Sequence, residues 1–405
     1  MSVLREIPPT AGWPLHAKDI LLFNENSHEG SLELDFKNYL DVEYVKVLNT
    51  ATAALYLILE TLKDISGKKT VIIPSFICPL VPLAVKKAGL NIEVCDVTGT
   101  DFNYDLNALE NTCSRDNDIL AVIAAHIGGI PVDLDPIIRM SEKCGAFVIE
   151  DCAQALGARY KNRLVGTMGD FSMFSLGRGK GLTIYQGGIA VANKRGHALL
   201  LENKIAQLVK NDFLAESVKI LELLGYWIFY RPQLFWSVFK LPQVFWLMQG
   251  DKLKAYTDYF EIDFPVHRVS FIRKYAGHAG FHNLETEINK QKQKAAYYIN
   301  NLKGVNGLRL VTEMPGTEAV YPYVTLIYDE PERRERAWNA LKDSGLGVSG
   351  VYSFAITDFD YLKDIVPGGD PAGGRSLAKN SITLSTSMFL GEEDLSYIVN
   401  QIKKL

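Results

Sequence analysis

The amino-acid sequence predicts an α/β fold with a mostly parallel central sheet flanked by helices. Between residues 45 and 195, short apolar runs such as TVIIPSF and ILAVIAAH alternate with amphipathic runs of helical length such as ATAALYLILETLKD. Buried β-branched runs separated by such helices are typical of βαβ units, whose sheet is covered on both faces. Ligands bind at the carboxyl ends of the strands in these sheets, so the functional residues are expected there.

The chain is long enough for two unequal domains. It has 405 residues, and single hydrophobic cores stop growing near roughly 250–300 residues. After about residue 262 the pattern changes to a charged helix, two short strands (YPYVTLIYD and NSITLST) and a closing helix, EEDLSYIVNQIKKL. We expect a large α/β domain over residues 1–200, an aromatic helical insertion over 201–262 and a smaller C-terminal α+β domain over 263–405.

Composition and charge argue against several classes of protein. The net charge of -4 is small, so nothing points to a nucleic-acid binder. The N-terminal residues lack the apolar core of a secretory signal and are interrupted by Pro8 and Pro9, so we expect a cytoplasmic protein. The cysteines are scattered and lack the close pairs of a zinc site, so we expect neither a disulfide bond nor a structural metal. They are Cys78, Cys95, Cys113, Cys144 and Cys152.

An aromatic segment, Phe213–Met248, lies between the two expected domains. Pro232 and Pro242 interrupt it and Arg231 and Lys240 add charge, so no apolar run reaches the ~20 residues of a membrane-spanning helix. One interpretation is a helical hairpin buried against the core or against a dimer partner. The other is a monotopic patch in a membrane interface, which would place the protein peripherally at the inner face of the membrane. The tryptophans of the segment are Trp227, Trp236 and Trp246.

Asp151 follows the apolar run AFVIE, which is predicted to be a central strand. A carboxylate at the carboxyl end of a parallel strand points into the ligand crevice, where it can hold a cationic heterocycle. The alternative is a helix N-cap, which is a common role of aspartate.

Thr50 and Thr52 open an apolar helix directly after the run VKVLN. A helix N-terminus offers unpaired amide N–H groups and the positive end of the helix dipole, so a phosphate group can bind there without a lysine. By itself this pattern is weak evidence, because a threonine N-cap is ordinary.

A glycine-rich stretch, FSLGRGKGLTIYQGG, contains a single lysine, Lys180. It does not match a phosphate-binding P-loop, because Gly181 rather than a hydroxyl residue follows the lysine. The flanking runs FSMFSL and GGIAVAN are predicted to be strands, which places Lys180 in a tight connection between buried elements. Burial destabilises an ammonium group, lowers its pKa and frees the amine for imine formation. A solvated loop lysine is the alternative.

The three signals fit one cofactor. Pyridoxal 5'-phosphate needs an anchor for its phosphate, a carboxylate beside its pyridinium nitrogen and a lysine that captures its aldehyde. The helix start at Thr50, Asp151 and Lys180 supply one of these each. We therefore predict a pyridoxal-phosphate site, with the cofactor held as an aldimine by Lys180 and without a metal.

Five blocks of the sequence resemble the DegT/DnrJ/StrS family of nucleotide-sugar aminotransferases. The blocks are TATAAL, IPSF, HIGGIPVDLDPI, VIEDCAQALGARYKNRLVGTMGD and FSLGRGKGLTIYQGGIAV. The resemblance covers most of the chain apart from the aromatic segment. It implies the fold-type-I architecture of pyridoxal-phosphate enzymes and a homodimer whose active site is built from both subunits.

The resemblance also implies roles for individual residues. The family's Schiff-base lysine falls on Lys180, and Arg268 matches an arginine near the shared active site. The pyridinium partner falls on Asp151 and the contact to the ring hydroxyl on Gln154. The positions implied to bind the phosphate are Thr50, Ala51, Thr52 and Ser175.

The implied reaction is a transamination in two halves. Glutamate, the expected amino donor, gives its amino group to the cofactor, Lys180 moves the proton, and a nucleotide- or lipid-linked keto-sugar takes the amine in glycan or polysaccharide biosynthesis. One competing hypothesis is a pyridoxal-phosphate enzyme with a non-sugar acceptor, or a dehydratase, although dehydratases of the family carry histidine in place of Lys180. The other is an idle relative that acts as a membrane-docked scaffold.

The sequence departs from the family's pattern at positions that concern the substrate and the cofactor ring. The aromatic residue that stacks on the ring falls at Cys78, which leaves Phe76 or His126 as substitutes. Three further positions differ: Ala51 replaces a glycine, Val266 an asparagine, and Tyr185-Gln186 a Gly-Glu pair.

Overall fold

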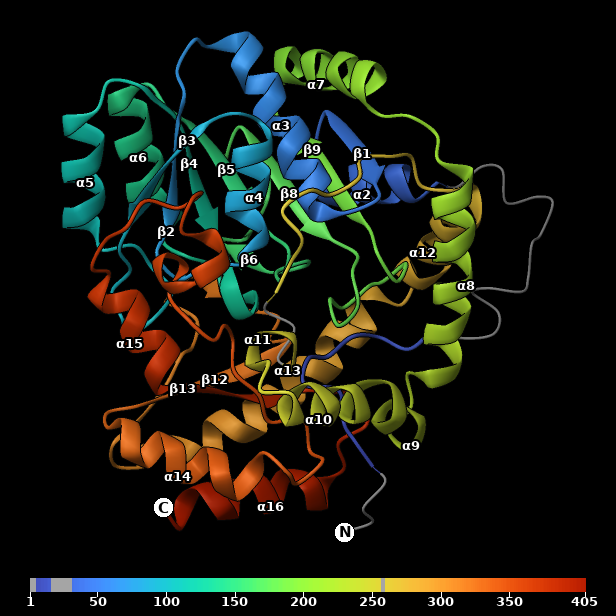
Figure 1. Cartoon of the computed structure of the whole chain (residues 1–405), viewed down its shortest axis with the longest axis vertical. Coiled ribbons are helices and arrows are strands. Elements are labelled where there is room, and N and C mark those ends of the chain that lie inside the picture. The colour runs from blue at the N-terminus through green and yellow to red at the C-terminus, as the bar shows by residue number, and fades with distance from the viewer. Residues whose placement is uncertain (1–4, 16–30, 256–258) are drawn as a thin grey trace.

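A seven-stranded sheet forms the centre of the computed structural model, which describes residues 5–15, 31–255 and 259–405. Its strands are β1 (Tyr44–Leu48), β2 (Thr70–Pro74), β3 (Asn91–Cys95), β4 (Ile119–Ala125), β5 (Phe147–Asp151), β8 (Phe171–Ser175) and β9 (Gly188–Ala192). They lie in the order β1-β9-β8-β5-β4-β2-β3 (Figure 1). All neighbours from β8 to β3 pair in parallel, and β9 is antiparallel to both β8 and β1.

Helices cover both faces of this sheet. The side chains of β2 alternate between the two faces: Val71 and Ile73 lie in the core with helices α3, α4 and α7, and Ile72 lies in the core with helices α2, α5 and α6. This arrangement confirms the predicted fold class. The helices are α2 (Leu32–Leu40), α3 (Ala51–Ile65), α4 (Leu80–Lys87), α5 (Leu106–Arg115), α6 (Leu134–Cys144) and α7 (Arg195–Leu208).

The C-terminal part is a smaller α+β unit, placed below the large sheet in Figure 1. Its three-stranded antiparallel sheet has the order β10 (Leu308–Leu310), β12 (Tyr323–Tyr328), β13 (Ser381–Ser385). A third sheet, of β6 (Arg159–Tyr160), β7 (Arg163–Leu164) and β11 (Thr317–Glu318), joins the two parts through the pairing of β6 with β11. Four longer helices, α13 (Leu284–Leu302), α14 (Pro331–Leu341), α15 (Ala372–Asn380) and α16 (Glu392–Lys403), and the short helices η2 (Ile127–Gly129), η4 (Ile356–Asp358) and η5 (Asp360–Leu362) complete the fold.

Between these two parts lie α8 (Phe213–Phe229), several short helices, a stretch without helix over residues 259–270, and α12 (Phe271–Phe281). The predicted domain boundary after residue 200 falls inside α7, which packs against α3 and β9 and so belongs with the large sheet. The rest of the domain division stays a prediction. The short helices of this part are α9 (Pro232–Phe235), the π-helix η3 (Trp236–Lys240), α10 (Leu241–Met248) and α11 (Lys252–Ala255).

The interpretation of Phe213–Met248 as a hairpin buried against the core is wrong for most of its length. Helix α8 buries Leu223 and Tyr226, but its first residues, Phe213 and Leu214, are about four-fifths exposed, at 82% and 79%. Six of the eight residues of α10 are exposed. No helix of the described residues is both long enough and apolar enough to cross a membrane. Contact with a dimer partner or a membrane interface stays a prediction.

The π-helix η3 has a local cause. Pro242 stands at the start of α10 and has no backbone N–H to donate to the preceding turn. Its ring also occupies the space that a regular α-helical turn would need. Widening the turn over Trp236–Lys240 accommodates both effects, and it lets α9, η3 and α10 run on as one helical arm.

A buried ion pair ties α8 to α12 and to the segment that follows Lys180. Arg273 of α12 is fully buried, and its guanidinium donates to both carboxylate oxygens of Glu216 in α8. The same guanidinium donates to the backbone oxygens of Ile184 and Gln186. Breaking such a buried pair costs about 3–5 kcal/mol, so the insertion and this segment are held in one fixed arrangement.

Glu6 makes the stability of the chain depend on pH. Its side chain is buried beneath the arm, and burial raises its pKa from 4.5 to about 7, with Lys240 lowering it and Asp343 raising it. The unfolded chain releases this proton near pH 4.5 and the folded chain near pH 7. Stability therefore falls as pH rises through this window, by on the order of 3 kcal/mol in total.

Glu6→Gln is expected to remove this dependence. In urea unfolding, the variant should lose the fall in free energy of unfolding between pH 4.5 and about 7 and should be more stable than the wild type above it. The exposed residue Glu43 supplies the control variant Glu43→Gln. Parallel stability profiles for wild type and Glu6→Gln would contradict this account of Glu6.

Candidate active site

A cavity of about 570 Å³, counting its open mouth, lies at the carboxyl ends of β4, β5 and β8. This is the edge of a parallel sheet at which ligands bind. Six of the seven predicted site residues line it, and the seventh, Thr50, caps the helix that points into it. The six are Ala51, Thr52, Asp151, Gln154, Ser175 and Lys180.

One end of the cavity is suited to an anion. Thr50 is the N-cap of α3, and its hydroxyl oxygen accepts the amide of Ala53 at 2.9 Å. The amides of Ala51 and Thr52 have no intrahelical partner, because the first N–H groups of a helix lie beyond the reach of its carbonyls. Ser175 ends β8 beside this helix start, and the paired Gly188 lets the backbones approach, since a Cβ there would clash with Ala51.

Asp151 ends β5 and lies inside the cavity wall. Its Oδ1 atom accepts the amide of Ala153 at 3.0 Å, and the residues that follow form turns, so the alternative of a helix N-cap is wrong. Burial raises the pKa of this carboxyl group, while the Ala153 amide, Lys180 and His126 lower it. A buried carboxyl group of this kind is stabilised as the anion when a cation binds beside it.

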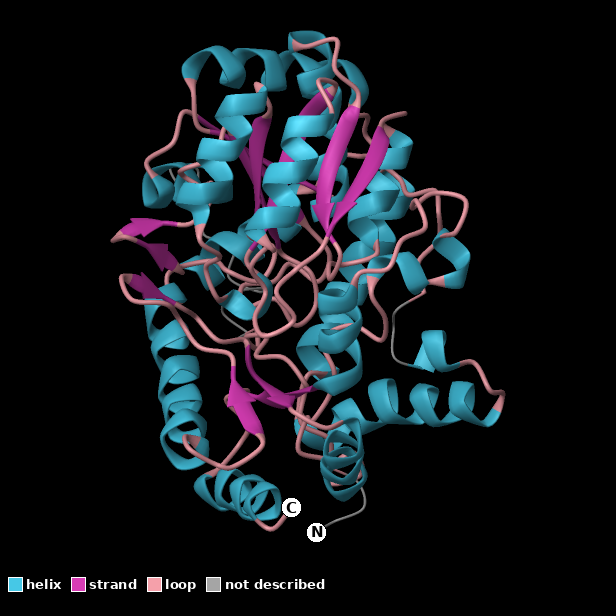
Figure 2. Ribbon diagram, turned by 90° about the vertical axis from the view of Figure 1, so that its left-hand side faces the viewer, coloured by secondary structure: helices cyan, strands magenta, loops and turns pink. Residues whose placement is uncertain are grey.

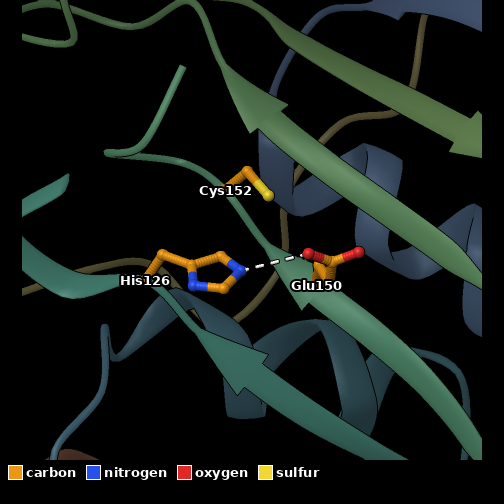
Figure 3. Close-up of side chains that lie close together, drawn as sticks. All are labelled: His126, Glu150 and Cys152. Carbon is orange, nitrogen blue, oxygen red and sulfur yellow. Dashed lines mark hydrogen bonds and ion pairs between the residues drawn. The ribbon is translucent and has the colours of Figure 1, made fainter. Parts of the chain in front are cut away.

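Below Asp151, a buried pair fixes the ends of β4 and β5 (Figure 3). His126 Nε2 lies 3.2 Å from Glu150, and its Nδ1 accepts the amide of Val132, which assigns the ring proton to Nε2. The backbone amide of His126 donates to the carbonyl of Asp151 at 3.0 Å. His126 therefore positions the carboxyl group of the site.

Both carboxylate oxygens of Glu150 accept hydrogen bonds. Its two oxygens also accept the amides of Gly166, Met168 and Gly169 at 2.7–2.8 Å. Burial pushes the pKa of Glu150 up, but His126 and these amides lower it by more. Cys152 lies beside the pair in Figure 3. Because the Glu150 oxygens are already occupied, this group is a hydrogen-bond network rather than an open set of metal ligands.

Lys180 lies in the turn between β8 and β9, and its amine faces the cavity. Burial lowers the pKa of the ammonium group, while Cys78 and Asp151 raise it. The partly buried side chain rules out the alternative of a solvated loop lysine. A lowered pKa leaves more of the amine neutral, which is the form that attacks an aldehyde.

An N-terminal strap, residues 8–13, holds the turn that carries Lys180. The amide of Trp13 donates to the carbonyl of Gly181 at 2.9 Å, and Ala11 donates to Pro322 of the C-terminal part at 2.9 Å. Gly179 has a φ of +71° and packs so closely on Thr10 that a Cβ there would clash with its hydroxyl. The turn is thus fixed by the beginning of the chain.

Gln154 is oriented by residues that the sequence did not reveal. Its Oε1 atom accepts the amide of Gly128 at 2.8 Å and the hydroxyl of Tyr323 at 2.6 Å. Its Nε2 group donates to Tyr352 at 3.4 Å, a long bond that leaves this amide able to donate to a ligand oxygen. Tyr352 lines the cavity as well. No local pattern marks either tyrosine, because both come from the C-terminal part.

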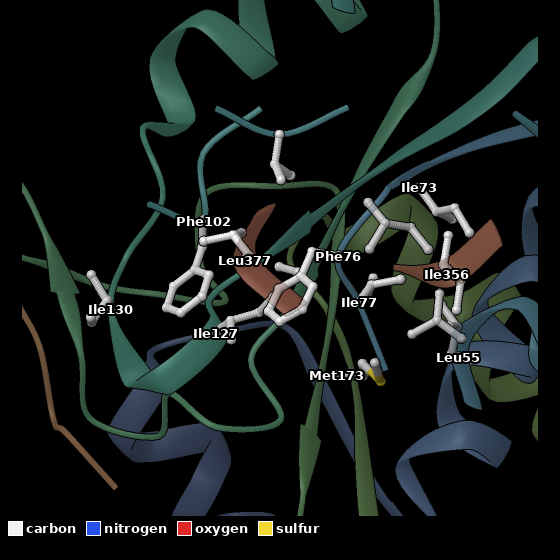
Figure 4. Close-up of a cluster of buried hydrophobic side chains, with 14 of the residues drawn as sticks. Leu55, Ile73, Phe76, Ile77, Phe102, Ile127, Ile130, Met173, Ile356 and Leu377 are labelled. Atoms are coloured by element: carbon white, nitrogen blue, oxygen red, sulfur yellow. The ribbon is translucent and has the colours of Figure 1, made fainter. Parts of the chain in front are cut away.

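The structure separates the candidates for stacking on a cofactor ring. Cys78 and His126 line the cavity. Phe76 instead stacks on Phe102, at 6.1 Å between ring centroids, within the apolar cluster of Figure 4. The His126 ring is fully buried and bound to Glu150, so the structure gives neither proposed substitute an exposed ring that faces the cavity.

Arg268 does not reach the cavity of its own chain. It is exposed, and its backbone lies beside the end of β1, where it bridges Leu48. Val266 precedes it and is half-buried. A role for Arg268 in a shared active site therefore requires a second subunit.

The cavity fits pyridoxal phosphate in the groups that it presents. Free helix amides beside a serine suit the phosphate, a buried carboxyl group suits the pyridinium nitrogen, and an amine with a lowered pKa suits the aldehyde. Together with the mostly parallel sheet, these groups define the fold-type-I class of pyridoxal-phosphate enzymes.

Residues 21–204 match the model of the DegT/DnrJ/EryC1/StrS aminotransferase family. The match covers just under half of the chain and lies in its N-terminal part. It confirms the predicted resemblance to this family of aminotransferases over these residues. The family implies pyridoxal phosphate as the cofactor.

Known proteins resemble the chain at low identity. The uncharacterized protein MJ1066 of Methanocaldococcus jannaschii is 23% identical over 382 residues, 91% of this chain and 88% of that protein. GDP-perosamine synthase of Escherichia coli O157:H7 is 32% identical over 163 residues, 40% of this chain and 44% of that enzyme. The aligned part thus spans less than half of this named enzyme. The crystal structure of the sugar aminotransferase CalS13 from Micromonospora echinospora superposes with a TM-score of 0.74 at 19% identity, over 98% of this chain and 99% of that one. At this identity the likeness shows the fold.

Proposed function

We propose that the protein is a pyridoxal-phosphate-dependent aminotransferase that moves an amino group from glutamate to a keto-sugar. The observation that carries the proposal is the meeting of three groups in one cavity: the amides at the start of α3, the Asp151 carboxyl group and the Lys180 amine. Each comes from a different element of the sheet's carboxyl edge. One shared ligand accounts for the position of all three groups better than separate structural roles do.

Pyridoxal phosphate supplies an aldehyde that condenses with amines and a ring that withdraws electrons from the bond being broken. Ala51, Thr52 and Ser175 bind its phosphate through amides and a hydroxyl group. Asp151 holds a proton on the ring nitrogen, and Gln154 donates from Nε2 to the ring hydroxyl. These contacts orient the ring before the substrate arrives.

Lys180 has two roles in this proposal. Its amine would hold the cofactor covalently, a role that its buried setting beside Asp151 supports. With an amino substrate bound in the cavity, Nζ would accept and return the substrate proton as a general base and acid. The lowered pKa suits both roles, because imine formation and proton abstraction each need the neutral amine.

The acceptor is proposed from the names of relatives. The aligned enzyme from Escherichia coli O157:H7 makes GDP-perosamine, a nucleotide-linked amino sugar by its name. A nucleotide- or lipid-linked keto-sugar of glycan biosynthesis is therefore the proposed acceptor. We also propose a homodimer, in which the exposed Arg268 reaches the cavity of the partner subunit.

The first half-reaction tests this function without knowledge of the sugar. Protein loaded with pyridoxal phosphate is expected to release one equivalent of oxoglutarate per site from L-glutamate and to lose its visible absorbance as it does so. D-glutamate serves as the matched control. Visible absorbance without release of oxoglutarate would rule out an aminotransferase that uses glutamate, and the alternative of a different pyridoxal-phosphate enzyme would then replace it.

A further inference from the structure

The arm of α9, η3 and α10, Pro232–Met248, carries apolar side chains that are exposed on the surface of the structure. In Figure 2 it extends to the right, away from the sheets. Leu234, Val238, Leu241, Phe245 and Met248 follow one another at intervals of four and three residues, so they form a stripe along one face of the helix. All five are exposed, and Met248 at the far end is 83% exposed. A patch of this kind marks an interaction surface.

The base of the arm is fixed to the body. The carbonyl of Pro232 accepts the amide of Glu6 at 2.9 Å, and Phe235 packs edge-on against Tyr230. Further along, the amine of Lys240 reaches the carbonyl of Lys342 and the carboxylate of Asp343. The stripe is therefore a fixed surface of the fold and not a loose segment.

The end of the arm is apolar around most of its circumference. In α10 the exposed residues include Val244 and Leu247, which lie on either side of the stripe. Only Gln243 and Trp246 of this helix are half-buried, and none of its eight residues is charged. A protein partner that lies against one face of a helix would leave the other exposed sides uncovered. A lipid phase surrounds an inserted end on all sides.

The sequence in and around the arm is basic, although the chain as a whole has a net charge of -4. No Asp or Glu lies between Leu223 and Gly250, although the chain has 47 acidic and 43 basic residues. Arg231 and Lys240 lie within this stretch, and Lys252 and Lys254 follow it. Lys240 pairs with Asp343 and Lys254 with Asp251, whereas Arg231 is exposed. A basic flank beside an apolar end is complementary to a membrane surface that carries anionic lipids.

We propose that the arm docks on an anionic phospholipid bilayer, with Phe245 and Met248 entering the interface and the exposed Arg231 and Lys254 facing the headgroups. The half-buried Trp246 lies at the level of the headgroups, which tryptophan prefers. The proposal narrows the predicted membrane contact of Phe213–Met248 to its second half. It is independent of the reaction that the cavity performs.

Vesicle flotation tests the proposal. The full chain loaded with pyridoxal phosphate is expected to float with vesicles of equal parts phosphatidylcholine and phosphatidylglycerol, and more weakly with phosphatidylcholine alone. The double variant Phe245→Glu/Met248→Glu should bind at least about tenfold more weakly, because two apolar side chains leave the interface. Arg231→Gln/Lys254→Gln should reduce the difference between the two kinds of vesicle.

The first turn of α8 supplies the matched control. Phe213→Glu/Leu214→Glu replaces two apolar side chains that are about four-fifths exposed, at the opposite end of α8 from the arm, and it should leave flotation unchanged. An equal loss of vesicle binding in both double variants would overturn the proposal, since nonspecific binding by exposed apolar side chains would then explain the flotation. So would an unaltered vesicle affinity of the arm variant together with a shift from dimer to monomer in sedimentation, which would identify the arm as a contact between two copies. Retained visible absorbance shows that each variant is folded, whatever the outcome of the glutamate assay.

Discussion

Replacing Lys180 by alanine is expected to lower amine transfer at least about a thousandfold, because the variant loses its general base as well as the group that holds the cofactor. No neighbouring residue that the structure describes can replace the amine of Lys180. Within the described residues that line the cavity, no other side chain carries an amine. The nearest basic residue in the same turn, Arg178, is exposed and lies over the ring of Tyr185.

The measurement is the visible absorbance of the purified protein together with the rate of oxoglutarate release. Both should be lost in Lys180→Ala, and both should persist in Arg178→Ala, which removes a cation from the same turn. The thermal midpoint of Lys180→Ala should not fall, since burial of an ammonium group stabilises nothing by itself. If Lys180→Ala kept its visible absorbance and its rate, another residue would have to hold the cofactor, and the proposed function would lose its main support.

Asp151→Asn is expected to lower the rate about a hundredfold to a thousandfold while the fold stays intact. An amide is close to a carboxylate in shape but cannot keep a proton on the ring nitrogen, so the ring withdraws electrons less well. The burial that raises the pKa of Asp151 also makes the carboxyl group costly to keep without a cation. The variant should therefore be as stable as the wild type, or more stable, in the absence of the cofactor.

The neighbouring residue on the same strand is the matched control for Asp151. Glu150 points to the opposite face of β5, where it accepts three backbone amides and pairs with His126. Glu150→Gln should therefore lower the unfolding temperature far more than it lowers the rate of the folded fraction. The reverse pattern, a stable Glu150→Gln with a lost rate and an active Asp151→Asn, would show that the two roles are wrongly assigned.

Strands that are buried on both faces could be predicted from their continuous apolar runs. The run ILAVIAA of β4 is wholly buried in the structure, so its apolar pattern identified it without any partner. Strand direction was not predictable in the same way. An apolar run that is buried on both faces has the same pattern whether its neighbour is parallel or antiparallel, so the reversal of β9 between β1 and β8 is visible only in the structure.

The chemistry of the site was predictable because each of its groups has a local signal. Asp151 ends an apolar strand, Thr50 opens a helix and Lys180 lies among glycines. The groups that hold these residues in place have no such signal. Tyr323 reaches Gln154 across a sequence separation of 169 residues, and its neighbours in the sequence give no hint of that contact.

The aromatic segment shows the limit of composition. Its tryptophans and phenylalanines allowed burial against the core, contact with a dimer partner or a place in a membrane interface, and the structure excludes the first for most of α10, which is exposed. Apolar content measures how much surface a segment can bury, but it does not identify what covers that surface. The distribution of charge around the arm, which involves residues beyond the segment, carries that information.

The strap at the beginning of the chain has a consequence for how the protein is made. Ala11 emerges first from the ribosome, yet its hydrogen-bond partner, Pro322, is added more than three hundred residues later. The large sheet can form well before that point, since domains fold in the order of synthesis. The newly made sheet then carries an open pocket whose lysine turn is unsupported on one side. The turn that carries Lys180 therefore gains its full support late, only when residues near Ala11 and Pro322 have come together.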